Sequence, residues 1–237
     1  MKIICPYIYE KEIAVHKEMF WEHDVYYEKD VTGIGSDLMY QKMWNKFPED
    51  DIFILHADMT IYQDDWYEKL EEYTKSYPNA GMIGCLLIYP IKNKDGTRFV
   101  QHAGGKFDEH GNPDHFGSGV HIESGQMFKQ PEADVEQYNT VRKVAWTTFG
   151  GLYIRREVLQ AVGDFSAEYE WTYNRDVDYC LQVRKLGYDI YNVPVRLFHH
   201  ESKDNKRIKN KQKAAMEMRN LETLKNKWKD TEWYKTL

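Results

Sequence analysis

The clearest indication of the fold class is the segment Asp51-Ile52-Phe53-Ile54-Leu55-His56-Ala57-Asp58. Residues 52–55 are all apolar, and a short uninterrupted apolar run of this kind predicts a buried β-strand. A strand that is apolar on both faces is typical of a parallel sheet covered by helices on both sides. The run leads directly into His56-Ala57-Asp58, so polar side chains follow at the carboxyl end of the strand, where open α/β sheets bind their ligands.

The rest of the chain alternates between helical and strand-like patterns. Helical spacing and stop signals predict helices over residues 10–21, 38–47, 65–77, 156–162, 176–186 and from 203 onward, with Ser36 as a helix cap. Apolar runs predict strands over residues 2–5, 24–28, 82–89, 144–148, 152–154 and 188–194. Residues 99–138 are rich in Gly, His and Asp and predict a binding loop or short hairpins. This order predicts an α/β protein with a mostly parallel central sheet flanked by helices.

Charge and cysteine usage limit the function classes. The net charge is −6 and the pI is near 5.9, which excludes a protein that binds nucleic acid through its overall charge. Cys5, Cys85 and Cys180 lie far apart in apolar runs and predict buried free thiols in a reducing compartment. The sequence shows neither a signal-peptide pattern nor an apolar run of ~18 residues that would span a membrane. We therefore expect a cytoplasmic protein.

Two motifs carry side chains suited to metal binding. Asp58 can supply a carboxylate ligand for Mg²⁺ or Mn²⁺ that supports a departing diphosphate, or it can simply cap the turn after the strand. His199 and His200, with Glu201 beside them, suit a divalent metal or a diphosphate. On spacing alone they are equally well explained as exposed loop histidines.

A third motif pairs two acids. Asp176 and Asp178 open a predicted helix, where the exposed N–H groups and the helix dipole stabilise carboxylates. Plain capping explains them, and so does a role of one carboxylate as the general base that takes a proton from an acceptor hydroxyl.

The order of these motifs, and the residues between them, resembles the family 2 glycosyltransferases of the GT-A fold. Residues 53–58, followed by Asp65-Trp66 and Leu70, look like that family's strand, metal motif and following helix. The second half of the resemblance consists of Trp146, Gly150-Gly151, Tyr153-Ile154-Arg155-Arg156, Val162-Gly163-Asp164-Phe165, Asp176-Val177-Asp178, Gly187-Tyr188, Pro194 and His199-His200-Glu201-Ser202. Residues 101–105 and 117–119 are similar to the variable middle region of sugar-adding members. The resemblance covers roughly residues 51–202.

The resemblance implies an inverting, hexosyltransferase-type enzyme with a catalytic domain over residues 1–202 and a helical extension over 203–237. Such an enzyme moves a sugar from a nucleotide diphosphate sugar to a hydroxyl of a glycan, a lipid-linked glycan or a glycoprotein, as in polysaccharide biosynthesis. Asp176 would be the catalytic base. The Mn²⁺ or Mg²⁺ ion would be bound by Asp58, His56, His199 and His200.

The resemblance also implies substrate contacts. The donor would meet Tyr7, Asp30, Ala57 and Asp58, of which the first two are placed near the base and ribose by topology alone. The acceptor side would be formed by Trp146, Gly150, Gly151, Arg175 and Asp178. The two glycines would let the backbone approach the donor or acceptor closely.

Three departures from the family pattern affect these expectations. Arg175 stands where the family usually has an acid, and it would lower the pKa of Asp176 if the two side chains made contact. His56 replaces the first acid of the metal motif, and imidazole suits Mn²⁺ better than Mg²⁺. The segment before Asp58 is short and lacks one strand–helix unit of the usual nucleotide-binding half.

The C-terminal segment is strongly basic and carries apolar residues at Met216, Leu221, Leu224 and Trp228. This pattern predicts a helix that is packed on the domain with a solvated basic face, and it is also suited to peripheral contact with an anionic membrane. Two other functions stay open. A metal-dependent hydrolase would use His56, Asp58 and His199 to activate water, and a non-catalytic module would bind a nucleotide sugar or carbohydrate without turnover.

Overall fold

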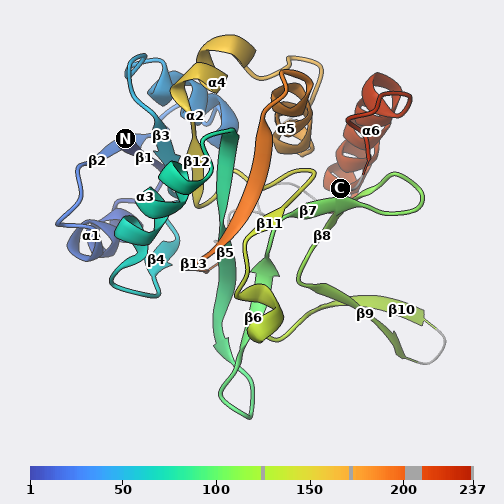
Figure 1. Ribbon diagram of the computed structural model, residues 1–237, viewed down its shortest axis with the longest axis horizontal. Coiled ribbons are helices and arrows are strands. Elements are labelled where there is room, and N and C mark those ends of the chain that lie inside the picture. Colours follow the sequence, from blue (N-terminus) through green and yellow to red (C-terminus); the bar gives the residue numbers. More distant parts are fainter. Residues whose placement is uncertain (124–125, 171–172, 201–209, 236–237) are drawn as a thin grey trace.

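The computed structural model of the chain describes residues 1–123, 126–170, 173–200 and 210–235. Within these ranges a nine-stranded sheet has the order β11-β13-β5-β12-β3-β1-β2, with β4 paired to β13 and β6 to β5 (Figure 1). Its strands are β1 (Lys2–Tyr7), β2 (Val25–Lys29), β3 (Ile52–Ile54), β4 (Met59–Ile61), β5 (Ala80–Lys92), β6 (Arg98–His102), β11 (Arg142–Lys143), β12 (Leu152–Ile154) and β13 (Asp189–His199).

The pairing directions bring several strand ends to one edge of the sheet. β1 is parallel to β2 and β3, β5 is parallel to β13, and β12 is antiparallel to both β3 and β5. The carboxyl ends of β1, β2, β3, β5 and β13 therefore lie at the same edge, together with the start of β12. The predicted α/β class is confirmed, but the sheet is mixed rather than mostly parallel, because β12, β4, β6 and β11 all pair antiparallel to their neighbours.

Helices cover both faces of this sheet. Side chains alternate along β3, so Ile52 and Ile54 join one buried cluster and Phe53 joins the other. The first cluster packs against α2 (Ser36–Trp44), α4 (Arg156–Val162), α5 (Arg175–Lys185) and α6 (Asn210–Trp228). The second packs against α1 (Glu10–Met19) and α3 (Trp66–Ser76). The uninterrupted apolar run thus reflects burial on both faces.

Most predicted elements are confirmed, with changed ends. β13 continues to His199 rather than stopping at 194, and β1 continues through Pro6 to Tyr7, where the strand still pairs with β2. Ser36 does not cap α2, since its hydroxyl donates to Asp37 and Gly35 occupies the cap position. Residues 144–147 are buried and Thr148 is half-buried, but the predicted strand over 144–148 does not form, because only Trp146 makes an isolated bridge, to Gly105.

The glycine-rich region folds mostly as short hairpins, as predicted. β7 (Gly105–Phe107) pairs with β8 (Pro113–His115), and β9 (Ser118–Glu123) pairs with β10 (Gln126–Pro131). A short 3₁₀ helix, Glu136–Tyr138, follows. The hairpins extend from the side of the sheet on which β6 lies (Figure 1).

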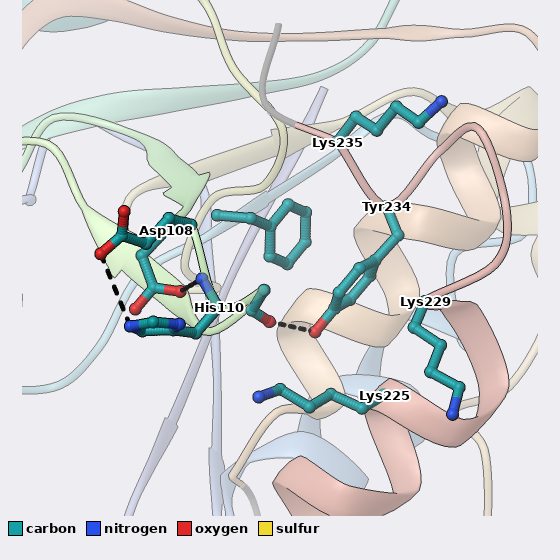
Figure 2. A pocket seen from close by; sticks show the side chains of 9 residues that line it. Asp108, His110, Lys225, Lys229, Tyr234 and Lys235 are labelled. Carbon is teal, nitrogen blue, oxygen red and sulfur yellow. Dashed lines mark hydrogen bonds and ion pairs between the residues drawn. The ribbon is translucent and has the colours of Figure 1, made fainter.

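The C-terminal helix is part of the same core. Leu224 and Trp228 of α6 are buried in the cluster that also holds Val177 of α5. Beyond the helix, Tyr234 packs its ring on Phe107 and its hydroxyl donates to the Gly111 carbonyl. Figure 2 shows this contact beside a cavity of about 450 Å³ between the 108–111 loop and α6. The packed interpretation of the basic helix is therefore confirmed for residues 210–228, whereas membrane contact and the division at residue 202 stay predictions.

Asp178 connects α5 to α6. The residue is 1% exposed, and its carboxylate accepts hydrogen bonds from Ser166, Tyr169, Gln182, Lys227 and Trp228. The closest of these contacts is the indole N–H of Trp228, at 2.7 Å, and the Lys227 ammonium lies 2.9 Å from the same oxygen. This carboxylate is buried and surrounded by donors, an environment that suits a structural role.

The three buried cysteines are free thiols, as predicted. Burial raises the pKa of each thiol well above its ordinary value. Across the described residues, no helix combines the length and the apolar character needed to cross a bilayer.

We expect Asp178→Ala to lower the free energy of unfolding by ~3 kcal/mol or more, because the buried indole N–H of Trp228 and the buried hydroxyl of Tyr169 both lose their acceptor, at ~1–3 kcal/mol each. Urea unfolding followed by tryptophan fluorescence measures this change. The exposed α6 residue Glu222 provides the control, and Glu222→Ala should change stability by less than ~0.5 kcal/mol. Equal stabilities of the two variants would contradict the role of Asp178 as the link between the helices.

Candidate functional site

Three side chains face one another beside the carboxyl ends of β3 and β13. His56, Asp58 and His199 each place one ligand-type atom within 4.8 Å of the others. His199 lies 143 residues further along the chain, at the end of β13, and its Nε2 is 3.3 Å from His56 Nδ1 and 3.3 Å from Asp58 Oδ1. Two imidazole nitrogens and a carboxylate oxygen at such spacing form a group that could hold a divalent cation.

Backbone pairing holds the two parts of this group together. β4 pairs antiparallel with β13 so that Met59 lies opposite His199, and the His200 amide donates to the Asp58 carbonyl over 3.0 Å. On the other side, Oε1 of Gln101 in β6 is 2.6 Å from His199 Nδ1. The site is thus built from three separate stretches of chain: 56–59, 101 and 199–200.

The environment keeps His56 neutral. Burial and the neighbouring His199 lower the pKa of His56 to about 4, although Asp58 acts in the opposite direction. The side chains of His199 and Asp58 are only 17% and 15% exposed. Neutral imidazole is the form that binds a metal, so His56 is in its ligating state near neutral pH.

His200, which the sequence also predicts as a metal ligand, lies outside this group. Its Nε2 is 2.9 Å from the hydroxyl of Thr60, and the residue is exposed. Because successive residues of a strand point to opposite sides, His199 and His200 diverge at the end of β13. Glu201 and Ser202, which complete the motif, lie outside the described residues.

Gly150 packs so closely against His56 and Met59 that a side chain at this position would collide with them. A Cβ atom at this position would lie 2.5 Å from Met59 Cε and 2.9 Å from His56 Cε1. The close neighbours of Gly150 are therefore side chains of the site itself. Gly151 has a φ of +63°, a conformation that favours glycine, and its backbone N–H donates to the Ile54 carbonyl over 3.0 Å.

The predicted base, Asp176, lies in the first turn of α5. Burial raises the pKa of Asp176 to about 6, even though the Val177 amide donates to its Oδ1 over 2.9 Å. Asn174, just before this turn, has a φ of +65°. A carboxyl group with a raised pKa beside an unusual backbone conformation is a common feature of functional sites.

Arg175 does not act on Asp176 as its position in the sequence suggests. Its guanidinium donates to the Tyr169 carbonyl over 2.7 Å, and no ion pair between the two side chains is found within the described residues. The shift of Asp176 is upward and comes from burial, so the lowering that direct contact would produce is absent.

The loop 147–150 contacts both α5 and the metal-binding group. The Thr147 amide lies 3.4 Å from Sγ of Cys180, one helical turn beyond Asp176, while Gly150 packs against His56. Trp146, predicted on the acceptor side, is 2% exposed and its indole N–H donates to the Lys106 carbonyl over 2.9 Å. Its ring fills the space that a side chain on Gly105 would need.

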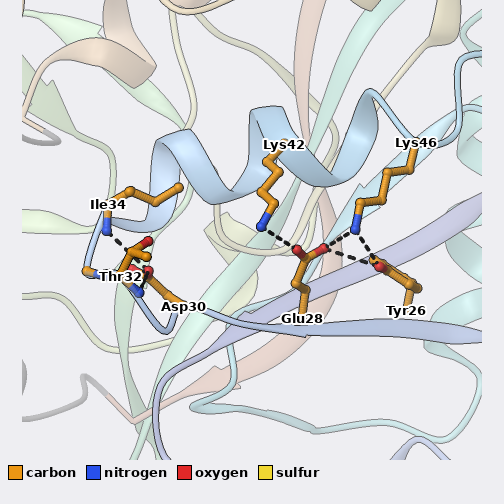
Figure 3. A network of polar contacts seen from close by, with 8 residues as sticks. Tyr26, Glu28, Asp30, Thr32, Ile34, Lys42 and Lys46 are labelled. Carbon is orange, nitrogen blue, oxygen red and sulfur yellow. Dashed lines mark hydrogen bonds and ion pairs between the residues drawn. The ribbon is translucent and has the colours of Figure 1, made fainter.

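Tyr7 and Asp30, predicted near the donor base, are neighbours at the ends of β1 and β2. The Asp30 amide donates to the Tyr7 carbonyl over 2.8 Å. Figure 3 shows that the Asp30 carboxylate points into its own loop, where it accepts the amides of Thr32, Gly33, Ile34 and Gly35 at 2.7–3.3 Å. Partial burial raises the pKa of Asp30, but these four bonds outweigh it and hold the pKa below its ordinary value.

Glu28 anchors α2 beside this loop. In Figure 3 its carboxylate faces Lys42 and Lys46, at 2.7 and 2.6 Å. Burial opposes the effect of these lysines, which nevertheless lower the pKa of Glu28 to about 2. Sequence reasoning gave no role to Glu28 and included Gln101 only in the 101–105 stretch of the family resemblance, since the partner of Gln101, His199, lies 98 residues away.

No protein-family model matches the chain. A curated relative, the uncharacterized protein y4gI of Sinorhizobium fredii (strain NBRC 101917 / NGR234), is 27% identical over 184 residues. That match includes 75% of this chain and 18% of the relative. The chain therefore corresponds to about a fifth of that protein.

Two solved glycosyltransferase structures share the fold. GalNAc-T7 with UDP, GalNAc and Mn²⁺ matches with a TM-score of 0.54 at 12% identity, covering 86% of this chain and 44% of that one. The mannosyltransferase PcManGT of Pyrobaculum calidifontis, in complex with GDP-Man and Mn²⁺, matches with a TM-score of 0.51 at 13% identity, covering 86% and 57%. The GT-A-like fold is thereby confirmed, while membership of family 2 stays a prediction.

We expect Asp30→Ala to loosen the 31–35 loop, because four backbone amides lose their acceptor. Amide hydrogen exchange at Thr32–Gly35 should accelerate about tenfold or more, since hydrogen bonds to a charged group are worth ~1.5–3 kcal/mol. Asp64→Ala, at an exposed position before α3, is the matched control and should leave these amides unchanged. Unaltered protection in Asp30→Ala would show that the loop is held by other contacts.

Proposed function

We propose that the chain is a metal-dependent glycosyltransferase that moves a sugar, with inversion, from a nucleotide diphosphate sugar to an acceptor hydroxyl. The observation that carries the proposal is the His56, Asp58 and His199 group at the carboxyl edge of a GT-A-like sheet. Ligands of open α/β sheets bind at this edge. The two similar structures named above were both solved with a nucleotide or nucleotide sugar and Mn²⁺.

The residues present fit a divalent cation. Two imidazoles and one carboxylate, largely shielded from solvent, suit Mn²⁺ better than Mg²⁺, which prefers oxygen ligands. His56, Asp58 and His199 would hold the ion, and His200 would stay with Thr60. When bound, the ion supplies positive charge that stabilises a departing nucleotide diphosphate.

Asp176 is the proposed general base. Its carboxylate would take the proton of the acceptor hydroxyl while that oxygen attacks the anomeric carbon and the nucleotide diphosphate leaves. A pKa near 6 leaves the group ionised at neutral pH, yet more basic than an ordinary carboxylate. Arg175, which bonds the Tyr169 carbonyl, would support the loop beside the acceptor.

The remaining contacts follow the geometry of the strand ends. Tyr7 and the Asp30 loop would border the nucleotide, with Asp30 acting through the loop that it orders. Ala57 lies between two residues of the metal group and would leave room for the donor. Gly150 and Gly151 would form the floor of the sugar site. Asp178, whose oxygens are occupied, would support α5 from behind.

The proposal is tested by following nucleotide diphosphate release from a panel of nucleotide sugars with Mn²⁺, with Mg²⁺ and with EDTA. We expect release from one donor with Mn²⁺ and loss of release with EDTA or in Asp58→Ala. Asp64→Ala, close in sequence but exposed, should retain the wild-type rate. Donor binding without turnover would instead favour a non-catalytic binding module. A release rate that EDTA leaves unchanged would exclude a role for a bound metal ion in the reaction.

Asp176 should control the pH dependence of transfer. Because a general base must be ionised, kcat should rise with pH through about 6 and then level off. Asp176→Asn should lower kcat by ~10²–10⁴-fold and remove this acidic limb. A limb that persists in the residual activity of Asp176→Asn would assign the titration to another group.

The raised pKa also predicts a stability profile. The folded state favours protonated Asp176, so its stabilising effect is complete below the ordinary pKa near 4 and is lost as pH rises through about 6. The unfolding free energy of Asp176→Asn should lack this decline when the two proteins are compared between pH 4 and 7.

A further inference from the structure

We propose that Gln101 is a positioning residue that holds His199 in the tautomer able to bind a cation through Nε2. This inference rests on the proposed metal site and goes beyond it, since Gln101 supplies no ligand atom to the group. It explains how one of the three ligands is kept ready for the metal.

The hydrogen bond between Gln101 and His199 has only one possible direction. Gln101 Oε1 lies 2.6 Å from His199 Nδ1. An amide oxygen can only accept a hydrogen bond, so the donor must be Nδ1–H. In the neutral form that binds a metal, an imidazole carries a single N–H, so a His199 with its N–H at Nδ1 keeps the lone pair on Nε2.

The lone pair on His199 Nε2 faces the other two members of the metal-binding group. His199 Nε2 is 3.3 Å from both His56 Nδ1 and Asp58 Oδ1. In the opposite tautomer, Nε2–H would donate to the Asp58 carboxylate, and a cation would have to displace that proton. With Nδ1–H held by Gln101, the Nε2 lone pair faces the carboxylate oxygen, and a cation relieves the repulsion between them.

Gln101 is itself held in place by the residue that follows it. The next residue, His102, is 1% exposed, and its backbone lies opposite Leu87 in the β5–β6 pairing. The Thr148 amide donates to His102 Nε2 over 3.3 Å, and His102 Nδ1 lies 2.8 Å from His115 Nδ1. The buried histidine fixes the end of β6 and with it the backbone from which Gln101 reaches His199.

The test compares wild type with Gln101→Met, which keeps the length but removes the acceptor, and with Gln101→Glu, which offers a stronger acceptor. Mn²⁺ binding is measured by electron paramagnetic resonance of the free ion, with no sugar donor present. Gln101→Met should weaken Mn²⁺ binding by ~10–100-fold, the usual effect of losing such a partner. Gln101→Glu should bind at least as tightly as wild type. Gln160→Met, at an exposed position on α4, is the matched control.

A second measurement reads the tautomer directly. Nitrogen-15 spectra of the metal-free protein should show His199 protonated at Nδ1 in wild type and in Gln101→Glu, and a shift toward Nε2–H in Gln101→Met. The same spectra verify that each variant is folded, so that a loss of affinity is not mistaken for unfolding.

The outcomes separate the two proposals. Wild-type Mn²⁺ affinity and an unchanged tautomer in Gln101→Met would overturn the role of Gln101 and leave the metal site intact. Absence of Mn²⁺ binding by wild type would overturn the metal site, and this inference with it. Equal weakening in Gln101→Met and Gln101→Glu would show that only the shape of glutamine matters, which also overturns the tautomer argument.

Discussion

The hydrogen bond from the His200 amide to the Asp58 carbonyl is the contact on which the site depends. It extends the β4–β13 pairing and joins residues that are 142 positions apart, 200 minus 58. The end of β13 is also held by its parallel pairing with β5 as far as Phe198, and the β4 pairing then brings Asp58 and Met59 beside His199. The sheet thus supplies the rigid frame that a metal-binding group needs, since its ligands must be held in place before the ion arrives.

Burial then decides the chemical state of the groups on that frame. It lowers the pKa of His56 to about 4 and raises the pKa of Asp176 to about 6, two shifts of opposite direction that both favour the neutral form. Both follow from the cost of placing a charge in an apolar environment. One shift prepares an imidazole for a metal, and the other makes a carboxylate more basic without another acid beside it. Burial alone therefore makes Asp176 a stronger base than an ordinary aspartate, and no acidic residue is needed at position 175.

The pair Asp176 and Asp178 illustrates how one motif is divided by the fold. Residues two positions apart in an α-helix are separated by about 200° around the helix axis, so these carboxylates point in nearly opposite directions. Asp178 faces α6 and is surrounded by five donors, whereas Asp176 stays in the first turn with the Val177 amide. The motif read as one acidic site is in fact a structural residue and a candidate catalytic residue side by side.

Local patterns such as apolar runs and helix stop signals were enough to predict the α/β class, most of the helices and strands, and Asp58 at the end of a buried strand. The sequence also identified His56 and His199 as candidates from their residue type. The folded structure was needed to show that His199 joins the group while His200 does not, that Asp30 binds its own loop, and that antiparallel strands, β12 among them, make the sheet mixed. It alone showed Gln101, whose contact with His199 joins strands separated by 98 positions. Such choices depend on strand register and burial, which arise when distant segments pack together and leave no mark at the residues concerned.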